Sequence, residues 1–301
     1  MNEEDLIEKI KNLYGKTKSS ILGIGDDCAV WVPKPDYEYL ITTDSAIEDI
    51  HFKLLEHPLA AIGYKALARS ISDIAAMGGM ACYVLVAFVK PPKITDLDVL
   101  EIYKGMNILL NQYHLELIGG DFSQGSALII NTTVIGCCPK GKSIKRSGMQ
   151  LGDQIYVTGS LGGSIYGKHL NFKPRILEAQ CLVENFNINA MIDISDGLSK
   201  DLWRMVRSSH KSVEIYADKI PVDAACQGVE DPLWHALNDG EDYELIFTSP
   251  QSEEDINLIM ETKFHIRCSN IGKVIGNNIE LWIQYPNGKK EFLKDEGFRH
   301  F

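Results

Sequence analysis

Residues 190–206 read AMIDISDGLSKDLWRMV and decide the fold class of this chain. The apolar run Ala190–Ile194 predicts a buried β-strand, and the pattern over Leu198–Val206 predicts a helix that begins directly after it. A strand that leads at once into a helix is typical of α/β domains. Two aspartates and a serine fall at this junction, so polar chemistry is expected there.

The same alternation of strand-like and helix-like segments continues on both sides of that stretch. Helices are expected over residues 3–14, from Pro58 to the Gly78-Gly79 pair, and between Asp96 and Tyr113. Strands are expected over Ala29–Val32, Tyr39–Thr43, Tyr83–Val89, Leu117–Ile118, Ala127–Cys138, Gln154–Thr158, Glu244–Thr248 and Ile279–Tyr285. The predicted fold class is therefore α/β (α+β), with such units in both halves.

The length of the chain predicts two domains. At 301 residues it exceeds the usual size of one domain. The composition shifts to Gly, Lys, Arg and Ser between Pro139 and Asp153, as expected for a connection. We therefore predict an N-terminal domain over residues 1–140 and a C-terminal domain over residues 141–301.

Charge and cysteine content exclude several classes of protein. The balance of 41 acidic to 30 basic residues argues against a broad basic face for nucleic acid or anionic lipid. The seven cysteines contain no C-x-x-C pair and predict reduced, mostly buried thiols. Neither a signal peptide nor an apolar run of about 18 residues occurs. We expect a cytoplasmic protein without nucleic-acid or membrane partners.

Two glycine-containing motifs suggest nucleotide binding but lack the required context. Residues 136–143, GCCPKGKS, match the P-loop pattern, yet two glycines and a new strand follow where the phosphate-binding helix should begin. Residues 23–27, GIGDD, hold only two glycines of a dinucleotide fingerprint, and no strand of useful length precedes them. A basic, exposed loop is the better interpretation of the first motif.

Aspartates beside glycines or hydroxyl residues recur at five places. They lie in GDD (25–27), TTD (42–44), GGD (119–121), DISDG (193–197) and DGED (239–242). Each alone is typical of a turn or a helix N-cap. Their number suggests more, because carboxylates gathered at strand ends repel one another unless cations lie among them. Mg²⁺ prefers such oxygen ligands.

Asp73 extends this set from the end of a predicted helix, in SISDIAAMGG (70–79). Lys65, Arg69 and Asp73 stand four residues apart on one helix face, so a surface ion pair is the local alternative. The metal interpretation requires that this helix end face the other aspartates.

Taken in order, these motifs resemble those of the thiamine-monophosphate kinase family, whose members use ATP to phosphorylate thiamine monophosphate to thiamine diphosphate. The resemblance rests on GIGDDCAV (23–30), TTD (42–44), HF (51–52), YKALA (64–68), SDIAAMGG (72–79), LIGGD (117–121), RSGMQLGDQIYVTG (146–159), KPRI (173–176), DISDGLSKDL (193–202), DGEDYEL (239–245) and GFRHF (297–301). The wider superfamily includes aminoimidazole-ribonucleotide synthetase and selenophosphate synthetase, but GEDYEL and the aromatic-His-Phe terminus resemble the thiamine-phosphate branch.

The resemblance implies a two-domain, aminoimidazole-ribonucleotide-synthetase-like fold. Its N-terminal domain would form a homodimer through its sheet, and its C-terminal domain would close over a cleft. Several Mg²⁺ ions would be held by Asp27, Thr42, Thr43, Asp44, Asp73, Asp121, Asp193 and Asp196. ATP would contact Tyr103, Gly120, Asp121, Arg146 and Ser195. Thiamine monophosphate would be held by His51, Glu241 and Phe298.

Three positions depart from the family pattern. Asp239 replaces the first glycine of the usual Gly-Gly-Glu-Asp, Phe122 stands where a Thr is common, and Phe298 stands where Tyr or Trp is usual. The first affects the turn that presents Glu241. The second removes a hydroxyl near the expected metals, and the third keeps a ring for stacking but removes its polar atom.

The expected mechanism is direct in-line transfer of the γ-phosphoryl group of ATP. The attacking phosphate is already ionised, because its second pKa is about 6, so no residue is assigned as a general base. Two alternatives remain: a sister ATP-dependent enzyme such as aminoimidazole-ribonucleotide synthetase, and a non-catalytic nucleotide-binding module. Release of ADP with and without thiamine monophosphate separates the three.

Overall fold

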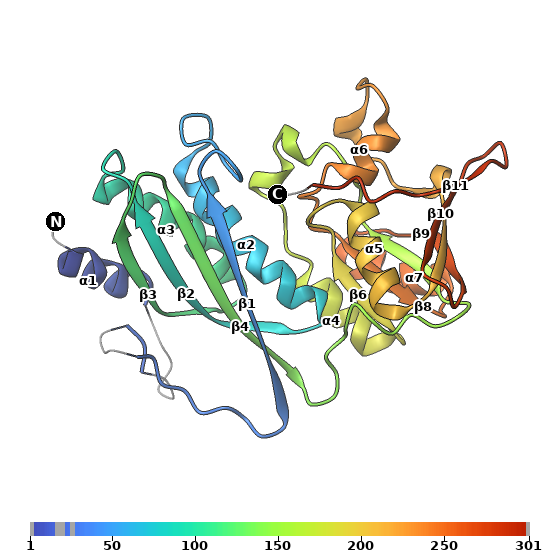
Figure 1. Ribbon diagram of the computed structural model, residues 1–301. Coiled ribbons are helices and arrows are strands. Elements are labelled where there is room, and N and C mark those ends of the chain that lie inside the picture. Colours follow the sequence, from blue (N-terminus) through green and yellow to red (C-terminus); the bar gives the residue numbers. More distant parts are fainter. Residues whose placement is uncertain (1–2, 16–21, 25–27, 299–301) are drawn as a thin grey trace. The chain divides into compact units, whose positions relative to one another are not determined.

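A computed structural model describes residues 3–15, 22–24 and 28–298 of the chain. The chain divides into two compact units, residues 1–74 with 79–141 and residues 75–78 with 142–301. Asp27 lies outside the described residues, so its predicted role as a metal ligand is not addressed by the structure. Each unit is described by itself (Figure 1).

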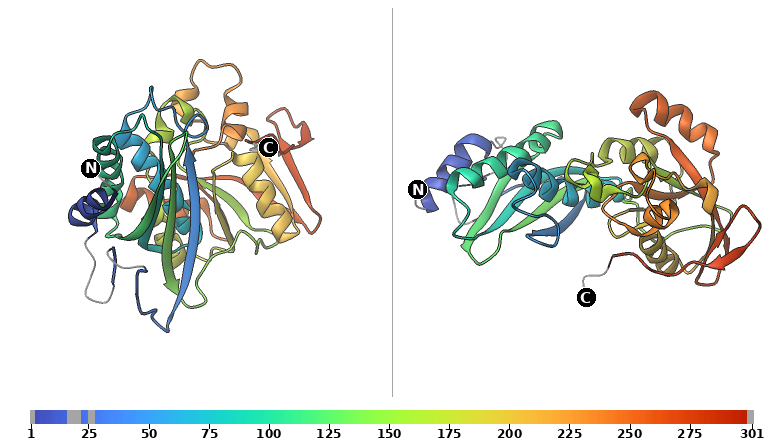
Figure 2. Two further views of the ribbon diagram at one scale, coloured as in Figure 1. Left: turned by 60° about the vertical axis from the view of Figure 1, so that its left-hand side comes forward. Right: turned by 90° about the horizontal axis from the view of Figure 1, so that it is seen from above.

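The first unit is a four-stranded sheet covered on one face by helices. The strands β1 (Tyr37–Ile47), β2 (Met80–Lys90), β3 (Glu116–Gln124) and β4 (Ile129–Pro139) lie in the order β1-β4-β2-β3. Only β2 and β3 pair in parallel. Helices α2 (Leu59–Ala76) and α3 (Asp96–Gln112) cover one face, and α1 (Glu3–Tyr14) packs beside α3 (Figure 2).

Two glycines allow α2 and α3 to approach closely. A Cβ on Gly63 would lie 1.9 Å from the carbonyl oxygen of Ile102, and one on Gly105 would lie 1.8 Å from that of Ala60. No side chain fits at either position, so the backbones of the two helices meet there. This crossing fixes α2, which carries Asp73, relative to α3, which carries Tyr103.

The second unit contains a seven-stranded sheet in the order β11-β10-β7-β9-β5-β8-β6. Its strands are β5 (Gln154–Thr158), β6 (Ala190–Asp193), β7 (Ser212–Tyr216), β8 (Leu245–Ser249), β9 (Cys268–Gly276), β10 (Glu280–Gln284) and β11 (Lys290–Phe292). Its α-helices are α4 (Ile176–Asn185), α5 (Leu198–Ser209), α6 (Pro232–Asn238) and α7 (Glu253–Phe264). Short 3₁₀ helices span Ser164–Tyr166, Lys168–Leu170, Ala217–Lys219 and Ala224–Cys226.

The apolar face of α5 packs on this sheet and builds a continuous core. Leu198, Leu202 and Val206 follow one another at four-residue steps and are fully buried together with Ile246 of β8 and Ile271 of β9. This burial explains why the sequence forms a helix immediately after β6. The ISDG junction between β6 and α5 is thereby held at one end of the sheet.

The strongly periodic elements agree with the sequence prediction, and the α/β class is confirmed. The predicted helix over residues 3–14 and the predicted strand Gln154–Thr158 match α1 and β5. The strand predicted over Ala29–Val32 is wrong: Val30 makes a single bridge to Leu22, and Val32 is 79% exposed. The pattern did not predict α4, α6, α7, β7, β9 and β11, which are short or carry many polar residues. Five of the seven cysteines are buried, as predicted.

Candidate active site

Thr42, Asp44 and Asp73 meet on the helix-covered face of the first sheet. The Thr42 hydroxyl donates to Asp73 Oδ2 over 2.5 Å, and the Ser70 hydroxyl donates to Asp44 Oδ2 over 2.9 Å. Arg69 of α2 lies 3.7 Å from the Asp44 carboxylate. The end of α2 therefore does face two of the other predicted ligands, as the metal interpretation required.

Thr43 and Asp121 occupy the opposite face of the sheet. Alternation along β1 turns Thr43 away from its neighbours Thr42 and Asp44. Across the sheet, Asp121 of β3 lies opposite Ala87 of β2. Ala87 lies opposite Asn131 of β4, and Asn131 lies opposite Ser45 of β1. Register partners share a face, so Asp121 lies on the same side as Thr43 and Ser45. The structure thus divides the predicted metal ligands of this unit between two faces.

The donor set on the helix-covered face suits a hard cation. Hydroxyl and carboxylate oxygens are the ligands that Mg²⁺ prefers, usually as one or two carboxylates with water and substrate phosphate. Within the described residues no three His, Cys, Asp or Glu side chains converge on one point.

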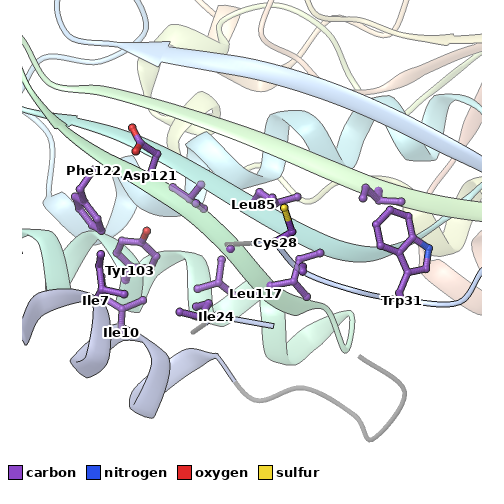
Figure 3. A pocket seen from close by; sticks show the side chains of 16 residues that line it. Ile7, Ile10, Ile24, Cys28, Trp31, Leu85, Tyr103, Leu117, Asp121 and Phe122 are labelled. Carbon is purple, nitrogen blue, oxygen red and sulfur yellow. The ribbon is translucent and has the colours of Figure 1, made fainter. Parts of the chain in front are cut away.

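A cavity of about 800 Å³ lies in the first unit, lined from α1, from strands β2 and β3, and by Ile24, Cys28, Ala29 and Trp31. Three residues predicted to contact ATP line it: Tyr103, Gly120 and Asp121. Figure 3 labels Tyr103 and Asp121 among the lining residues. Burial raises the pKa of Tyr103, so its hydroxyl stays protonated at neutral pH. The cavity walls are mostly apolar, with the Asp121 carboxylate as the charged group among them. Such a lining is typical of small-molecule binding sites.

Phe122 belongs to the packing of this cavity. Its ring lies 5.4 Å from that of Phe88 and 6.4 Å from that of Tyr103. Asp121, one residue earlier, stands on the opposite face of β3. The replacement of the family's Thr by Phe122 therefore adds a ring to the aromatic side chains packed around Tyr103.

His51 is held in one tautomer when it is neutral. The backbone N–H of Ile47 donates to His51 Nδ1 over 3.1 Å, so the ring proton resides on Nε2. The carbonyl oxygen of His51 accepts a hydrogen bond of 2.5 Å from Lys65, whose side chain is fully buried. The neighbours of this histidine thus set its position and its tautomer.

In the second unit five predicted site residues lie at or beside the β6–α5 junction. The Ser195 carbonyl accepts from the Glu241 N–H over 2.8 Å, and the Asp196 carbonyl accepts from the Phe298 N–H over 3.0 Å. Asp193, at the end of β6, is 5% exposed. Residues predicted separately for metal, ATP and substrate are therefore neighbours in this unit.

Asp196 is engaged by cations rather than open to solvent. Its Oδ2 lies 2.5 Å from Arg204 and 3.0 Å from Lys200. A metal at this carboxylate would have to compete with both, so its ligand role stays a prediction. Asp201, which the sequence reasoning missed, accepts hydrogen bonds from the N–H groups of Ser195 and Asp196. An acid in the first turn of a helix after the junction was the available signal.

The loop over residues 239–244 carries Glu241. Most of the other acidic side chains in this loop form hydrogen bonds or ion pairs within the protein. Asp242 is buried and accepts from the Gly162 N–H at 3.1 Å and the Ser164 hydroxyl at 2.8 Å. Burial raises the pKa of Asp242 to about 7. Glu244 is also buried and is paired with Arg175. Glu241, whose Oε2 lies 3.4 Å from His169 Nδ1, has a side chain that is 30% exposed.

Asp239, the departure from the family's glycine, has a structural role. It follows α6 with ordinary helical dihedrals, φ −62° and ψ −38°, so its backbone does not require glycine. Its carboxylate lies 2.9 Å from His235 Nδ1 and accepts from the Gly163 N–H over 2.9 Å. The substitution therefore adds contacts behind Glu241 instead of distorting the turn.

The connecting segment after β4 contains no P-loop. Residues 142–150 form no helix, so Lys142 and Ser143 cannot begin the phosphate-binding turn. The interpretation of this motif as a loop is confirmed. Arg146 is exposed in the same segment, and its contact with ATP stays a prediction.

Comparison with known proteins shows the family of the chain. The family model "AIR synthase related protein, N-terminal domain" matches residues 25–138, and the model of the C-terminal domain matches residues 150–283. Thiamine-monophosphate kinase of Rhodopirellula baltica is 36% identical, covering 96% of this chain and 95% of the relative. That of Bacillus subtilis is 33% identical, covering 100% of both.

Solved structures give the same picture. A thiamine-monophosphate kinase from Stenotrophomonas maltophilia K279a has a TM-score of 0.82 at 28% identity, covering 96% of this chain and 98% of that one. AaThiL, complexed with AMPPCP and TMP, has a TM-score of 0.76 at 26% identity, covering 99% and 97%. With relatives above 30% identity along nearly the whole length, this chain belongs to the thiamine-monophosphate kinase family.

Proposed function

We propose that the chain transfers the γ-phosphoryl group of ATP to thiamine monophosphate and so forms thiamine diphosphate. Full-length relatives carry the name of this activity, and AaThiL binds an ATP analogue together with TMP. The observation in this molecule that carries the proposal is that Tyr103, Gly120 and Asp121 all line one cavity. In this account the adenine occupies the apolar part of the cavity and the phosphates extend past Asp121.

Mg²⁺ would be held together with the ATP phosphates by carboxylate and hydroxyl oxygens. The candidates are Asp27, Thr42, Thr43, Asp44, Asp73, Asp121, Asp193 and Asp196. When bound, the metal supplies positive charge that offsets repulsion between two polyanions. The protein residues then position the reactants, with Gly120, Ser195 and Arg146 at the nucleotide. No general base is needed, because the attacking phosphate oxygen is already ionised.

Thiamine monophosphate would be held by charge and by stacking. The half-exposed carboxylate of Glu241 suits the positively charged thiazolium ring of the substrate. His51, which Ile47 holds in one tautomer, would contact the substrate, as the family motif implies. The Phe298 ring is 45% exposed and offers a face for stacking.

We further propose that the chain works as a homodimer in the cytoplasm. Ile41 of the edge strand β1 is 67% exposed on the face of the sheet that points away from α2 and α3. An apolar sheet face of this kind favours coverage by a partner copy. An Ile41→Glu variant should shift the molar mass in light scattering from dimer to monomer. No helix among the described residues is long and apolar enough to cross a membrane.

The nucleotide site can be tested with an intrinsic probe. Of the protein's four tryptophans, Trp31 lines the cavity, whereas Trp203, Trp234 and Trp282 belong to the second unit. Saturating Mg-ATP should change the fluorescence of the wild-type protein. In Trp31→Phe that change should be lost while calorimetry still detects binding. A fluorescence change that persists in Trp31→Phe, or no saturable binding of ATP at all, would place the nucleotide elsewhere.

A further inference from the structure

The segment over residues 168–175 runs alongside the loop that carries Glu241. It contacts the loop at three-residue intervals: His169 meets Glu241, Phe172 meets Tyr243, and Arg175 meets Glu244. The His169 Nδ1 atom lies 3.4 Å from Glu241 Oε2. The ring centroids of Phe172 and Tyr243 are 3.9 Å apart, with the planes inclined by 15°. The two segments are therefore in contact along their length.

The third contact anchors the pair of segments. Arg175 donates from Nε over 2.7 Å and from Nη2 over 2.6 Å to the two oxygens of Glu244. Lys168 adds a contact of 3.3 Å to the same carboxylate. Two parallel bonds between a guanidinium and a carboxylate fix direction as well as distance. The end of the loop nearest β8 is therefore held firmly.

The middle of the loop, in contrast, has a backbone that needs support. Glu241 and Tyr243 have φ values of 55° and 50°, in the left-handed region that side-chain-bearing residues seldom adopt. Such conformations persist only where the surroundings hold them. On one side the N–H groups of Glu241 and Tyr243 donate to the carbonyls of Ser195 and Ile194, each over 2.8 Å. On the other side lie Phe172 and His169.

We propose that Phe172 and His169 are positioning residues for substrate selection, holding Glu241 in the direction from which it meets the cationic ring of thiamine monophosphate. The proposal rests on the proposed function of Glu241. Phe172 is 3% exposed and acts through Tyr243, because its ring holds the strained turn in place. His169 is buried and stands beside the carboxylate itself, whose side chain is 30% exposed. His169 thus lies against one side of the Glu241 carboxylate, and the exposed part of the side chain can be reached by a ligand.

Kinetics of four variants test the proposal. Phe172→Leu keeps an apolar side chain but removes the ring, and His169→Gln keeps a polar group but removes the imidazole. Each should raise KM for thiamine monophosphate by roughly 3- to 10-fold, in line with the usual worth of an aromatic or charge-assisted contact. KM for ATP and kcat should stay within about 2-fold. Phe172→Tyr retains the stack and should behave as wild type, as should the neighbouring Asn171→Ala, whose side chain is exposed.

A double-mutant comparison separates positioning from a general loss of structure. If Phe172 acts through Glu241, adding Phe172→Leu to Glu241→Gln should raise KM for thiamine monophosphate by less than 2-fold beyond the single Glu241→Gln change. Independent multiplication of the two effects would overturn the proposal, as would an equal rise in both Michaelis constants. If Glu241→Gln itself leaves KM for thiamine monophosphate unchanged, the substrate role of Glu241 fails. If KM for thiamine monophosphate is raised in Glu241→Gln but normal in Phe172→Leu and His169→Gln, only the positioning role of Phe172 and His169 is refuted.

Discussion

The Thr42 hydroxyl and the Asp73 carboxylate lie 31 residues apart in the sequence and are joined by a hydrogen bond of 2.5 Å between β1 and the end of α2. Asp44 shares the same face and is bonded to Ser70, one helical turn before Asp73. Residues from the family's TTD and SDIAAMGG motifs therefore form one polar cluster on the helix-covered face of the sheet. This cluster makes the predicted metal chemistry testable by single substitutions.

Asp44→Asn should abolish metal-dependent turnover without unfolding the protein. The amide keeps an oxygen that can accept from Ser70 but loses the negative charge that a metal requires. We expect a fall in kcat of about 100-fold or more, with a change in the free energy of unfolding below about 1 kcal/mol. Steady-state ADP release and chemical denaturation measure the two quantities. Asp49→Asn is the matched control, because Asp49 is exposed and its φ of 63° suits asparagine. Near-normal turnover in Asp44→Asn would remove Asp44 from the metal site.

Gly120→Ala and Gly119→Ala should differ sharply in stability. A Cβ on Gly120 would lie 2.0 Å from the carbonyl oxygen of Val86, so β2 and β3 must separate at the edge of the nucleotide cavity. A Cβ on Gly119 meets no atom closer than Leu85 Cδ2 at 3.4 Å. We expect Gly120→Ala to lose about 2 kcal/mol or more of unfolding free energy and to weaken ATP binding. Denaturation and calorimetry of both variants check this, and equal behaviour would contradict the strand contact.

Asp242 gives the stability of the protein a pH dependence of defined sign. Burial raises the pKa of its carboxyl to about 7 in the folded state, whereas an unfolded Asp ionises near pH ~4. Between these values the folded protein retains a proton that the unfolded chain has lost, so unfolding free energy falls as pH rises. Asp242→Asn removes this contribution.

The measurement is the difference between the wild-type and Asp242→Asn unfolding curves from pH 4.5 to 8. The wild-type curve should fall relative to the variant curve up to about pH 7 and then run parallel to it. Asp201, whose pKa burial raises to about 6, contributes equally to both proteins and cancels. Parallel curves over the whole range would show that Asp242 titrates as an ordinary carboxyl.

Asp239→Gly, which restores the residue usual in the family, should destabilise this particular chain. It removes the contacts of the carboxylate with His235 and with the Gly163 N–H. It also adds backbone freedom to the unfolded state. We expect a loss of about 2 kcal/mol in thermal or chemical unfolding. Asp239→Asn keeps an acceptor for Gly163 and should lose less. A more stable Asp239→Gly protein would mean that the aspartate strains the turn.

The parts of the fold that follow from local periodicity were predictable. Helix α1 and strand β5 have clear apolar patterns that are decided by the nearest neighbours in the sequence. Helix α7 buries chiefly Ile256 and Met260, too few apolar residues for a visible stripe. Strand β9 mixes polar with apolar residues, and its place between β5 and β7 comes from distant partners.

The candidate site was predictable in composition but not in arrangement. Period-two alternation alone separates Thr43 from Thr42 and Asp44, so part of the division between faces was present in the sequence. The partners of Asp242 and Glu244 lie about 70 to 85 residues earlier in the chain, at Ser164, Arg175 and Thr158. Pairings at that separation in the sequence depend on the assembled sheet, so no local sequence pattern predicts them. Asp27 remains a prediction from the family motif.

The central claim is that this chain is an ATP-dependent kinase whose acceptor is the phosphate of thiamine monophosphate. The most direct measurement incubates the purified protein with Mg-ATP, with and without thiamine monophosphate, and quantifies ADP and thiamine diphosphate by chromatography. The account predicts equal amounts of both products, formed only when thiamine monophosphate and Mg²⁺ are present, and lost in Asp44→Asn. ADP release that is independent of thiamine monophosphate, or its complete absence in a protein that binds ATP, would contradict the account.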